Sequence, residues 1–343
     1  MKKHLSSVGV VRRVFIATIL AGTALIAAAS PATSKIYTMK VACNSINDVQ
    51  SEWTKLFAAR IEKRSHGRIK ATVYPGGQLG TTPRIIEGVQ FGAIEAYVVP
   101  AENFVGVDKR FAVVGAPGWF DNIAQAKRAI LDPRFRDQFL KLGEKKGLVG
   151  VSLFVYGPDS YATREPIRSP DDFKGKKIRV AASKLQSLPL QRLGASADPI
   201  PLSEVLPAFQ QGTVDGVRLS INLFNNYKYY DVAKYVTDTN EAVLVSVGVV
   251  SRIWFDKLPK DLQKIVLEEG ANLDREMSDY STGQFKDAEA QWQKHGGTII
   301  HFSAPDQARF MKVGRAAAKD VFAQEPGTQR LYGLLRQVAK ANE

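Results

Sequence analysis

The chain has 343 residues, of which 45% are hydrophobic and 24% are charged, and its formal net charge is +13. These proportions are typical of soluble globular domains and exclude a disordered, collagen-like or disulfide-stapled small protein. The length is sufficient for two domains, each with a sizeable core. Basic and acidic residues alternate along the chain, so the positive charge favours a solvated basic surface over a nucleic-acid-binding one.

The first 32 residues predict an export signal. The basic segment Met1–Arg13 precedes the apolar run Val14–Ala29, which is shorter than the ~20 residues that span a bilayer. Small residues up to Ala29 and Ala32 fit signal-peptidase cleavage, and the arginine pair in the basic segment resembles a twin-arginine signal. An uncleaved anchor is the alternative. We expect residues 1–32 to be removed and the mature protein to be soluble and periplasmic.

The mature chain begins with alternating strand and helix patterns. Apolar periodicity predicts strands at 36–43, 69–74 and 92–99, with helices at 48–64 and from Thr82 onward. In the second helix Thr82 is the expected cap and Pro83 the first helical residue. This alternation predicts an α/β domain with a largely parallel sheet.

The same unit recurs in the second half of the chain. Strands are predicted at 148–156, 177–182, 214–219 and 243–250, and helices from Ser169 and at 185–193, 203–211 and 221–230.

One helix is predicted to be exceptionally long, from Pro259 to His295. It would span about 55 Å, more than the width of a small domain, so we expect it to brace two domains. A strand at 298–302 and helix from Pro305 follow. We expect two α/β lobes joined by crossing strands, with a cleft between them. Their predicted bounds are 33–155 plus about 245–285 for lobe I, and 156–244 plus about 286–343 for lobe II.

Catalytic, metal and cofactor motifs are absent from the sequence. It contains no nucleophile elbow, zinc-protease motif, phosphate-binding loop or dinucleotide fingerprint. His66 and His295 stand beside glycines at predicted helix ends, His301 ends a strand, and Cys43 lies in an apolar run. We therefore expect a protein that is not an enzyme and that has no metal site and no cofactor.

Arg179 is the candidate binding residue that the pattern itself indicates. It lies within the predicted strand 177–182, between Ile178 and Val180, so its side chain points to the opposite face from theirs. Ligands of open α/β sheets lie beyond the carboxyl ends of strands, where a guanidinium could grip a carboxylate with two hydrogen bonds. A surface arginine on a strand is the alternative reading.

Four segments, in order along the chain, form a further pattern. They are Tyr74–Gly80 (YPGGQLG), Asp172–Val180 (DFKGKKIRV), Ser203–Gly216 (SEVLPAFQQGTVDG) and Leu258–Lys264 (LPKDLQK). Their sequences and spacing resemble the motifs of DctP-type substrate-binding proteins of TRAP (tripartite ATP-independent periplasmic) transporters. The resemblance covers nearly the whole mature chain.

The resemblance implies two α/β lobes joined by a hinge and braced by a long helix. It further implies that a small organic acid binds in the cleft and that the closed protein, a monomer, delivers it to a TRAP membrane permease driven by a sodium gradient. No nucleic-acid partner is expected. An exported enzyme on a similar fold, or a ligand-sensing lobe of a receptor, is the alternative.

The resemblance also transfers individual residues. Arg179 matches the family arginine that pairs with the ligand carboxylate, and Asn44 matches an asparagine at the end of an early strand. Asp159 stands where sugar-acid binders have a second arginine. Leu219 stands at a family asparagine, with Arg218 beside it.

These departures from the family pattern leave the chemical class of the ligand undetermined. An aspartate cannot grip a carboxylate, but it accepts hydrogen bonds from hydroxyls or pairs with a cation. The ligand could carry one carboxylate at Arg179 together with hydroxyl, amine or apolar groups. Arg218 could instead supply a second positive group for a dicarboxylate, or it could pair structurally with Asp159.

Weaker candidates lie on loops after predicted strands. Gln78, Thr82, Asn103 and Trp119 belong to this set, and both Trp119 and Tyr161 are either cleft or core residues.

Overall fold

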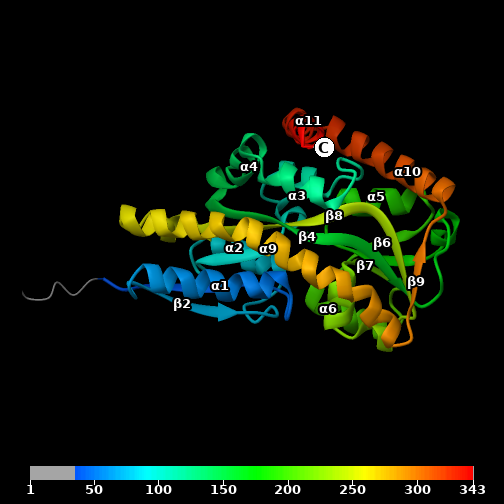
Figure 1. The fold of residues 1–343 in the computed structure, drawn as a ribbon, viewed down its shortest axis with the longest axis horizontal. Helices are drawn as coiled ribbons and strands as arrows, with labels where there is room; N and C mark the ends of the chain where they lie inside the picture. Colours follow the sequence, from blue (N-terminus) through cyan, green and yellow to red (C-terminus); the bar gives the residue numbers. More distant parts are fainter. Residues whose placement is uncertain (1–34, 343) are drawn as a thin grey trace, which may run out of the picture. The chain divides into compact units, whose positions relative to one another are not determined.

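The computed structural model describes residues 35–342 (Figure 1). The predicted export signal and its cleavage site lie outside the described residues. From Ile36 onward the chain forms one compact unit. None of the helices in the described part combines the length and the apolar character that crossing a bilayer requires.

One mixed sheet organises this unit. Within the described residues nine strands pair in the order β2-β1-β3-β8-β4-β7-β5-β6, and β9 also pairs with β8. The strands are β1 (Tyr37–Ala42), β2 (Ile69–Tyr74), β3 (Ala96–Pro100), β4 (Leu148–Thr163), β5 (Lys177–Val180), β6 (Ser196–Pro199), β7 (Gly216–Leu219), β8 (Tyr235–Ser251) and β9 (Thr298–His301).

Two long antiparallel strands, β4 and β8, connect the two halves of the sheet. Their register runs from Leu148 opposite Ser251 to Thr163 opposite Tyr235. The flanking pairs β1–β2, β1–β3, β5–β6 and β5–β7 are parallel. The prediction of a largely parallel sheet therefore holds for the flanks and is wrong for the centre. Apolar runs of strand length do not reveal the direction of pairing, because both kinds of buried strand look alike in sequence.

The register of β4 against β8 shifts around Gly157, between Val155 and Gly157 and again between Pro158 and Ser160. Gly157 has a φ of 150°, a conformation that residues with a Cβ rarely adopt. A bulge of this kind bends a strand and changes which face its side chains occupy.

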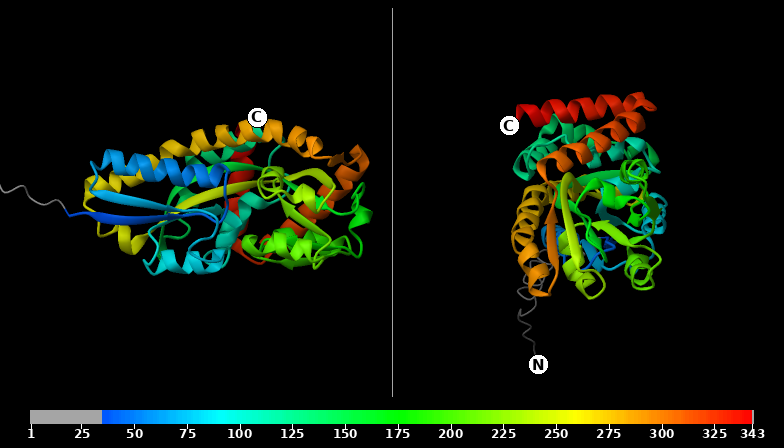
Figure 2. Two further views of the ribbon diagram at one scale, coloured as in Figure 1. Left: turned by 90° about the horizontal axis from the view of Figure 1, so that it is seen from below. Right: turned by 90° about the vertical axis from the view of Figure 1, so that its right-hand side faces the viewer.

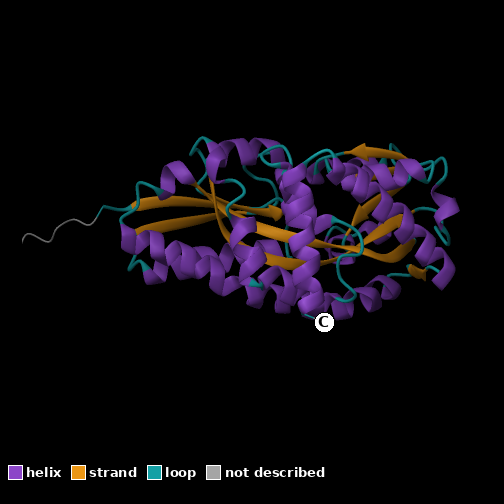
Figure 3. Cartoon of the chain, turned by 90° about the horizontal axis from the view of Figure 1, so that it is seen from above, coloured by secondary structure: helices purple, strands orange, loops and turns teal. Residues whose placement is uncertain are grey.

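Helices cover both faces of the sheet (Figure 3). The α-helices are α1 (Val49–Arg64), α2 (Thr82–Gln90), α3 (Ile123–Leu131), α4 (Pro133–Leu140), α5 (Lys184–Arg192), α6 (Leu202–Gln210), α7 (Ile221–Asn226), α8 (Arg252–Phe255), α9 (Lys260–Lys294), α10 (Ala304–Ala323) and α11 (Pro326–Ala341). Short 3-10 helices are η1 (Ala101–Phe104), η2 (Lys109–Gly115), η3 (Glu144–Lys146), η4 (Pro170–Phe173) and η5 (Tyr229–Asp231).

Alternate residues of β8 face two different cores. Leu244 and Val250 belong to the cluster under α1 and α9, whereas Val245, Val247 and Val249 belong to the cluster with α3, α4 and α11. This alternation follows from the period of two along a strand. Both faces of the long strands are therefore buried, which explains their almost continuous apolar sequence.

The long helix is present as α9, from Lys260 to Lys294, and packs along β4 while also contacting α1, α7 and β9 (Figures 1 and 2). Asp274 accepts hydrogen bonds from Ser152 Oγ (2.7 Å) and Leu153 N (2.8 Å). Gly270 allows the close approach, because a Cβ there would lie 2.4 Å from the carbonyl oxygen of Val151. The expectation of one helix bracing both halves is confirmed.

Several predicted boundaries differ from the structure. The cap of α2 is Thr81 rather than Thr82, and its side chain makes no capping hydrogen bond. β3 begins at Ala96 rather than Gly92, which lies in the turn after α2. α7 ends at Asn226, and the segment continues as a separate 3-10 turn.

Candidate functional site

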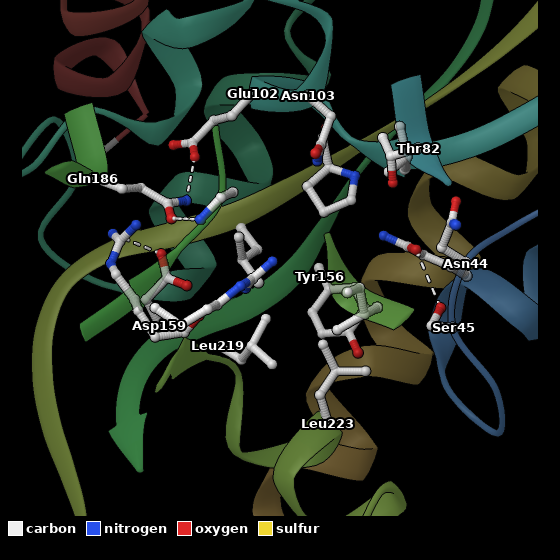
Figure 4. Close-up of a pocket in the computed structure, with 18 residues that line it drawn as sticks. Asn44, Ser45, Thr82, Glu102, Asn103, Tyr156, Asp159, Gln186, Leu219 and Leu223 are labelled. Atoms are coloured by element: carbon white, nitrogen blue, oxygen red, sulfur yellow. Dashed lines mark hydrogen bonds and ion pairs between the residues drawn. The ribbon is translucent and has the colours of Figure 1, made fainter. Parts of the chain in front are cut away.

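The cavity beside the centre of the sheet is lined from both halves of the chain (Figure 4). Its volume is about 60 Å³, room for a few water-sized groups. The lining residues are Asn44, Ser45, Gln50, Thr82, Val99, Pro100, Glu102, Asn103, Tyr156, Asp159, Arg179, Ala181, Gln186, Leu202, Arg218, Leu219, Leu223 and Leu244. Both β4 and β8 contribute, through Tyr156, Asp159 and Leu244, so the strands that connect the halves also form the cavity wall.

Arg179, on β5, is buried in this wall, with 4% of its surface exposed. Its Nε and Nη2 atoms donate to the Ile200 carbonyl at 2.8 and 2.7 Å, and Nη1 lies 3.4 Å from the Arg218 carbonyl. Among the described residues no carboxylate forms an ion pair with it. Burial lowers the pKa of Arg179 to about 10, so the guanidinium stays charged at neutral pH. Nη1 and Nη2 each carry two N–H groups and each make one of these hydrogen bonds. One N–H on each atom therefore remains to donate to a ligand carboxylate in the two-bond arrangement typical of arginine.

Arg218, on the neighbouring strand β7, is in the opposite situation. Its Nη2 lies 2.8 Å from Asp159 Oδ2, and its Nε lies 3.1 Å from Glu241 Oε1. Glu241 also accepts a hydrogen bond of 2.7 Å from Tyr161. Two carboxylates therefore compensate the charge of Arg218, although its buried Nη1 has no partner in the described part of the chain. The pairing of Asp159 with Arg218 that the sequence left open is present, and both residues line the cavity.

The pKa of Asp159 is raised to about 7. Burial is the main cause, Arg218 opposes it, and Glu102 and Glu241 add to it. The Asp159 carboxyl consequently changes charge near neutral pH.

Glu102, on η1, brings a further buried carboxyl group to the cavity. Its Oε2 accepts a hydrogen bond from Gln186 Nε2. Gln186 Oε1 in turn accepts a hydrogen bond of 2.8 Å from the backbone amide of Ala181. Burial raises the pKa of Glu102, and Arg218 opposes this shift. No ion pair joins Glu102 to any cation among residues 35–342. Its protein partner is thus a neutral amide.

The opposite side of the cavity is formed by neutral groups (Figure 4). Asn44 lies at the end of β1, where its Oδ1 accepts from the Tyr97 hydroxyl and its Nδ2 donates to the Gly80 carbonyl at 3.2 Å. Tyr156 donates to Asp48 at 2.9 Å. Leucines, including Leu219 and Leu223, line the space between the two sides.

The structure brings four of the predicted site residues together in the cavity: Asn44, Asp159, Arg179 and Arg218. Three others are not among its lining residues. Gln78 is exposed in the turn after β2, and the indole of Trp119 is buried and donates to the Val114 carbonyl at 2.9 Å.

Tyr161 is the third of these, buried against Phe173 and Phe310. Its hydroxyl donates to Glu241 at 2.7 Å, and on the backbone it lies opposite Arg218 of β7. The sequence analysis left a core position open as an alternative to a cleft position. Trp119 and Tyr161 both lie in the core. The weaker candidates Thr82 and Asn103 do line the cavity.

Sequence reasoning missed two acidic members of the cluster, Glu102 and Glu241. Glu102 follows β3 directly, and loops after strands are where cavity residues arise, so its position was an available signal. Glu241 lies within β8 at the end of a polar stretch, just before the apolar run of that strand, so its sequence carried no comparable signal. Gln186 lies inside α5 and carried no such mark.

The sequence of this chain matches one protein family. The model of bacterial extracellular solute-binding protein family 7, the DctP family, matches residues 41–325. The chain belongs to this family. The predicted recognition is confirmed, and so is the predicted fold class of α/β type with two lobes, hinge strands and a bracing helix.

Curated members of family 7 are related over most of their length. The C4-dicarboxylate-binding periplasmic protein DctP of Rhodobacter capsulatus is 27% identical over 291 residues, covering 83% of this chain and 85% of the relative. The 2,3-diketo-L-gulonate-binding periplasmic protein YiaO of Escherichia coli is 27% identical over 237 residues, covering 68% and 72%.

A solved structure supports the fold. The TRAP periplasmic solute-binding protein of Desulfovibrio salexigens, with bound orotic acid, superposes with a TM-score of 0.85 at 22% identity, covering 90% of this chain and all of that one. Family 7 and these relatives are binding proteins rather than enzymes.

Proposed function

We propose that this protein captures a small organic acid in the cavity around Arg179 and delivers it to a TRAP-type membrane permease for sodium-driven uptake. The observation that carries the proposal is Arg179 itself: a buried guanidinium whose Nη1–Nη2 edge retains donors and which has no carboxylate partner in the described residues. Buried charges in proteins are normally paired, so an unpaired one in a cavity wall favours a ligand of opposite charge. DctP, YiaO and the orotate-bound protein are named for acids or bind one, which supports the same class.

In this proposal the cavity opens and closes between two lobes. Lobe I comprises 33–155 and about 245–285, and lobe II comprises 156–244 and the chain after about 286, as the sequence analysis placed them. One change follows from the packing, because α11 lies against α3, α4 and η2 and so goes with lobe I. The irregular pairing around Gly157 is the proposed hinge, because a bulged glycine in a connecting strand absorbs backbone rotation.

The proposed protein acts in the periplasm as a monomer, after cleavage of the signal within residues 1–32, and binds without turnover. The cavity-lining residues in the described chain include no histidine and no cysteine, so their polar side chains are carboxyl, amide, hydroxyl and guanidinium groups. Cys43 is buried beside β1, where burial raises the pKa of its thiol to about 12. A thiol in that state is a poor nucleophile.

The test compares Arg179→Ala with Arg60→Ala in melting-temperature and calorimetric titrations against a panel of mono- and dicarboxylates. Arg60 is a matched control, because it forms a partly exposed ion pair with Glu276. A ligand at 100 times its Kd adds about 2.7 kcal/mol to the free energy of unfolding, which is readily measured. We expect the wild type and Arg60→Ala to bind and Arg179→Ala to lose binding while remaining folded. Equal affinity in all three would contradict the role of Arg179.

A further inference from the structure

Two buried groups of opposite charge lie in the cavity wall without ionic partners among the described residues. Arg179 is bound to carbonyl oxygens, and Glu102 is bound to the amide of Gln186. Both side chains are at least nine-tenths buried. Burying either charge alone is costly, and a charged ligand that meets it repays that cost.

The remaining charges of the cluster already compensate each other. Arg218 lies within 3.1 Å of both Asp159 and Glu241, so it attracts a ligand anion much less than Arg179 does. A second ligand carboxylate beside this cluster would meet Asp159 and Glu102 as well as Arg218. Like charges at short range in a buried site are strongly unfavourable, which disfavours a dicarboxylate.

The rest of the wall limits the ligand further. Leu202, Leu219, Leu223 and Leu244 offer no hydrogen-bond partners to a chain of hydroxyl groups. Asn44, Ser45 and Thr82 on the opposite side could meet some hydroxyls of a sugar acid. Any hydroxyl turned toward the leucines would lose hydrogen bonds and therefore binding free energy. The small volume, about 60 Å³, favours a compact molecule with an apolar middle.

From these contacts we propose that the ligand is a small zwitterion, whose carboxylate binds Arg179 and whose cationic nitrogen binds Glu102. This inference rests on the proposed function, since it names the class of acid that the same cavity takes. Gln186 donates to Oε2 of Glu102, Oε1 lies against Gly115, and Glu102 is one of the residues that line the cavity. Burial raises the pKa of Glu102 although Arg218 opposes the shift, and a cationic ligand group beside the carboxyl would lower that pKa again.

The experiment uses matched trios of compounds that share a carbon skeleton and differ in one group. Alanine, lactate and propionate form one trio, and 4-aminobutyrate, 4-hydroxybutyrate and butyrate form a second. Proline, tetrahydrofuran-2-carboxylate and cyclopentanecarboxylate form a third, and succinate and malate represent dicarboxylates. Titration calorimetry of the exported protein at pH 7 gives the affinity of each compound.

We expect the amino member of at least one trio to bind at least tenfold more tightly than its hydroxy and unsubstituted partners. Glu102→Gln should remove that advantage, because a neutral amide of the same shape no longer pairs with a cation. The control is Glu241→Gln, which makes the same chemical change in a carboxylate that does not line the cavity. In this control the ratio of amino to hydroxy affinity should be unchanged, even if all affinities fall together.

The outcomes separate this inference from the proposed function. Tighter binding of a hydroxy acid, an unsubstituted acid or a dicarboxylate would overturn the zwitterion and leave carboxylate capture intact. An amino preference that survives Glu102→Gln would overturn the assignment of Glu102. Failure of every carboxylate to bind would contradict the proposed function itself, and the inference with it.

Discussion

Two buried charged regions of this protein use the same residue types and differ in how their hydrogen bonds are completed. Where α9 crosses β4, Asp274 Oδ1 accepts from Ser152 and Leu153, and Oδ2 accepts 2.6 Å from Arg136 Nε. Every oxygen of that carboxylate has a protein partner. In the cavity, Arg179 forms no ion pair with a carboxylate among the described residues. Arg218 Nη1 has no hydrogen-bond partner there, and the Glu102 carboxyl accepts a hydrogen bond from the Gln186 amide.

This difference separates a structural ion pair from a binding site. A carboxylate that is fully bonded within the protein contributes to the stability of the native state and has no donors or acceptors to offer a ligand. A cluster in which some donors and acceptors have no protein partner contributes less to stability. Those groups can form hydrogen bonds or ion pairs with a bound ligand. Changes in the first region should therefore alter the free energy of unfolding, and changes in the second should alter affinity.

The largest expected effect is on stability, from Asp274→Ala. The change removes the acceptor of Arg136 Nε and of the Leu153 amide at the contact between α9 and β4. Breaking a buried pair by removing one partner costs about 3–5 kcal/mol, and the partial exposure of Arg136 places this case at the lower end. Urea unfolding should show the loss. A loss below 1 kcal/mol would mean that the two regions do not differ as described.

The dependence of stability on pH should distinguish Asp159 from the rest of the cluster. Its pKa is about 7 in the folded protein, against about 3.9 for an aspartate in an unfolded chain. Between these values the folded state holds more protons, so its contribution to the free energy of unfolding falls as the pH rises from about 4 to 7. From pH 5 to pH 8 this amounts to about 2–3 kcal/mol.

Asp159→Asn should remove this part of the pH dependence. Asp274, whose pKa is raised to about 6 mainly by burial, remains as an internal reference. The measurement is the difference between the urea midpoints at pH 5 and pH 8 in the wild type and the variant. An unchanged difference would show that Asp159 is ionised throughout this range.

The same Arg→Lys change should affect binding in the cavity and stability at the contact between α9 and β4. Lysine keeps the charge but loses the planar fork, so Arg179→Lys should weaken binding of a carboxylate by about 1.5–3 kcal/mol with little change in stability. Arg136→Lys should lower stability and leave affinity unaltered. Titration calorimetry and urea unfolding of both variants give the four values. An affinity loss in Arg136→Lys comparable to that in Arg179→Lys would contradict the separation of the regions.

Much of the fold was predictable because its long elements carry strong periodic patterns. The helix 260–294 and the strand at 69–74 were expected within one residue at each end. The direction and full length of β4 and β8 were not, because these strands continue past Gly157 and Asp238 into less apolar sequence. Pairing between strands distant in sequence leaves no local pattern to read.

The site was predictable only where a residue stood out against its neighbours. Arg179 in an apolar strand and Asp159 at a departure from the family pattern both lie in the cavity. Trp119 was a weaker candidate, and its indole donates to a carbonyl in the core. Whether an aromatic side chain faces a cavity or a core depends on packing between distant segments, and the sequence of its own segment does not contain that information.

The smallest expected effects come from two glycines of α9, and they test how tightly the helix lies on β4. A Cβ at Gly270 would stand 2.4 Å from the Val151 carbonyl oxygen, whereas a Cβ at Gly283 has nothing within 4 Å. Gly270→Ala should therefore force the helix away from β4 and cost about 1–3 kcal/mol. Gly283→Ala should instead stabilise the protein by up to about 1 kcal/mol, because alanine favours the helix.

The two glycine variants share one helix and one substitution, so the difference between their urea midpoints isolates the close approach itself. Since Asp274 lies one turn beyond Gly270, a shift of the helix also lengthens its hydrogen bonds to Ser152 and Leu153. Gly270→Ala should consequently lose much of its effect in an Asp274→Ala background, while Gly283→Ala should be additive there. If Gly270→Ala were instead additive with Asp274→Ala, the carboxylate and the close contact would act independently. The structural region would then be two separate contacts rather than one.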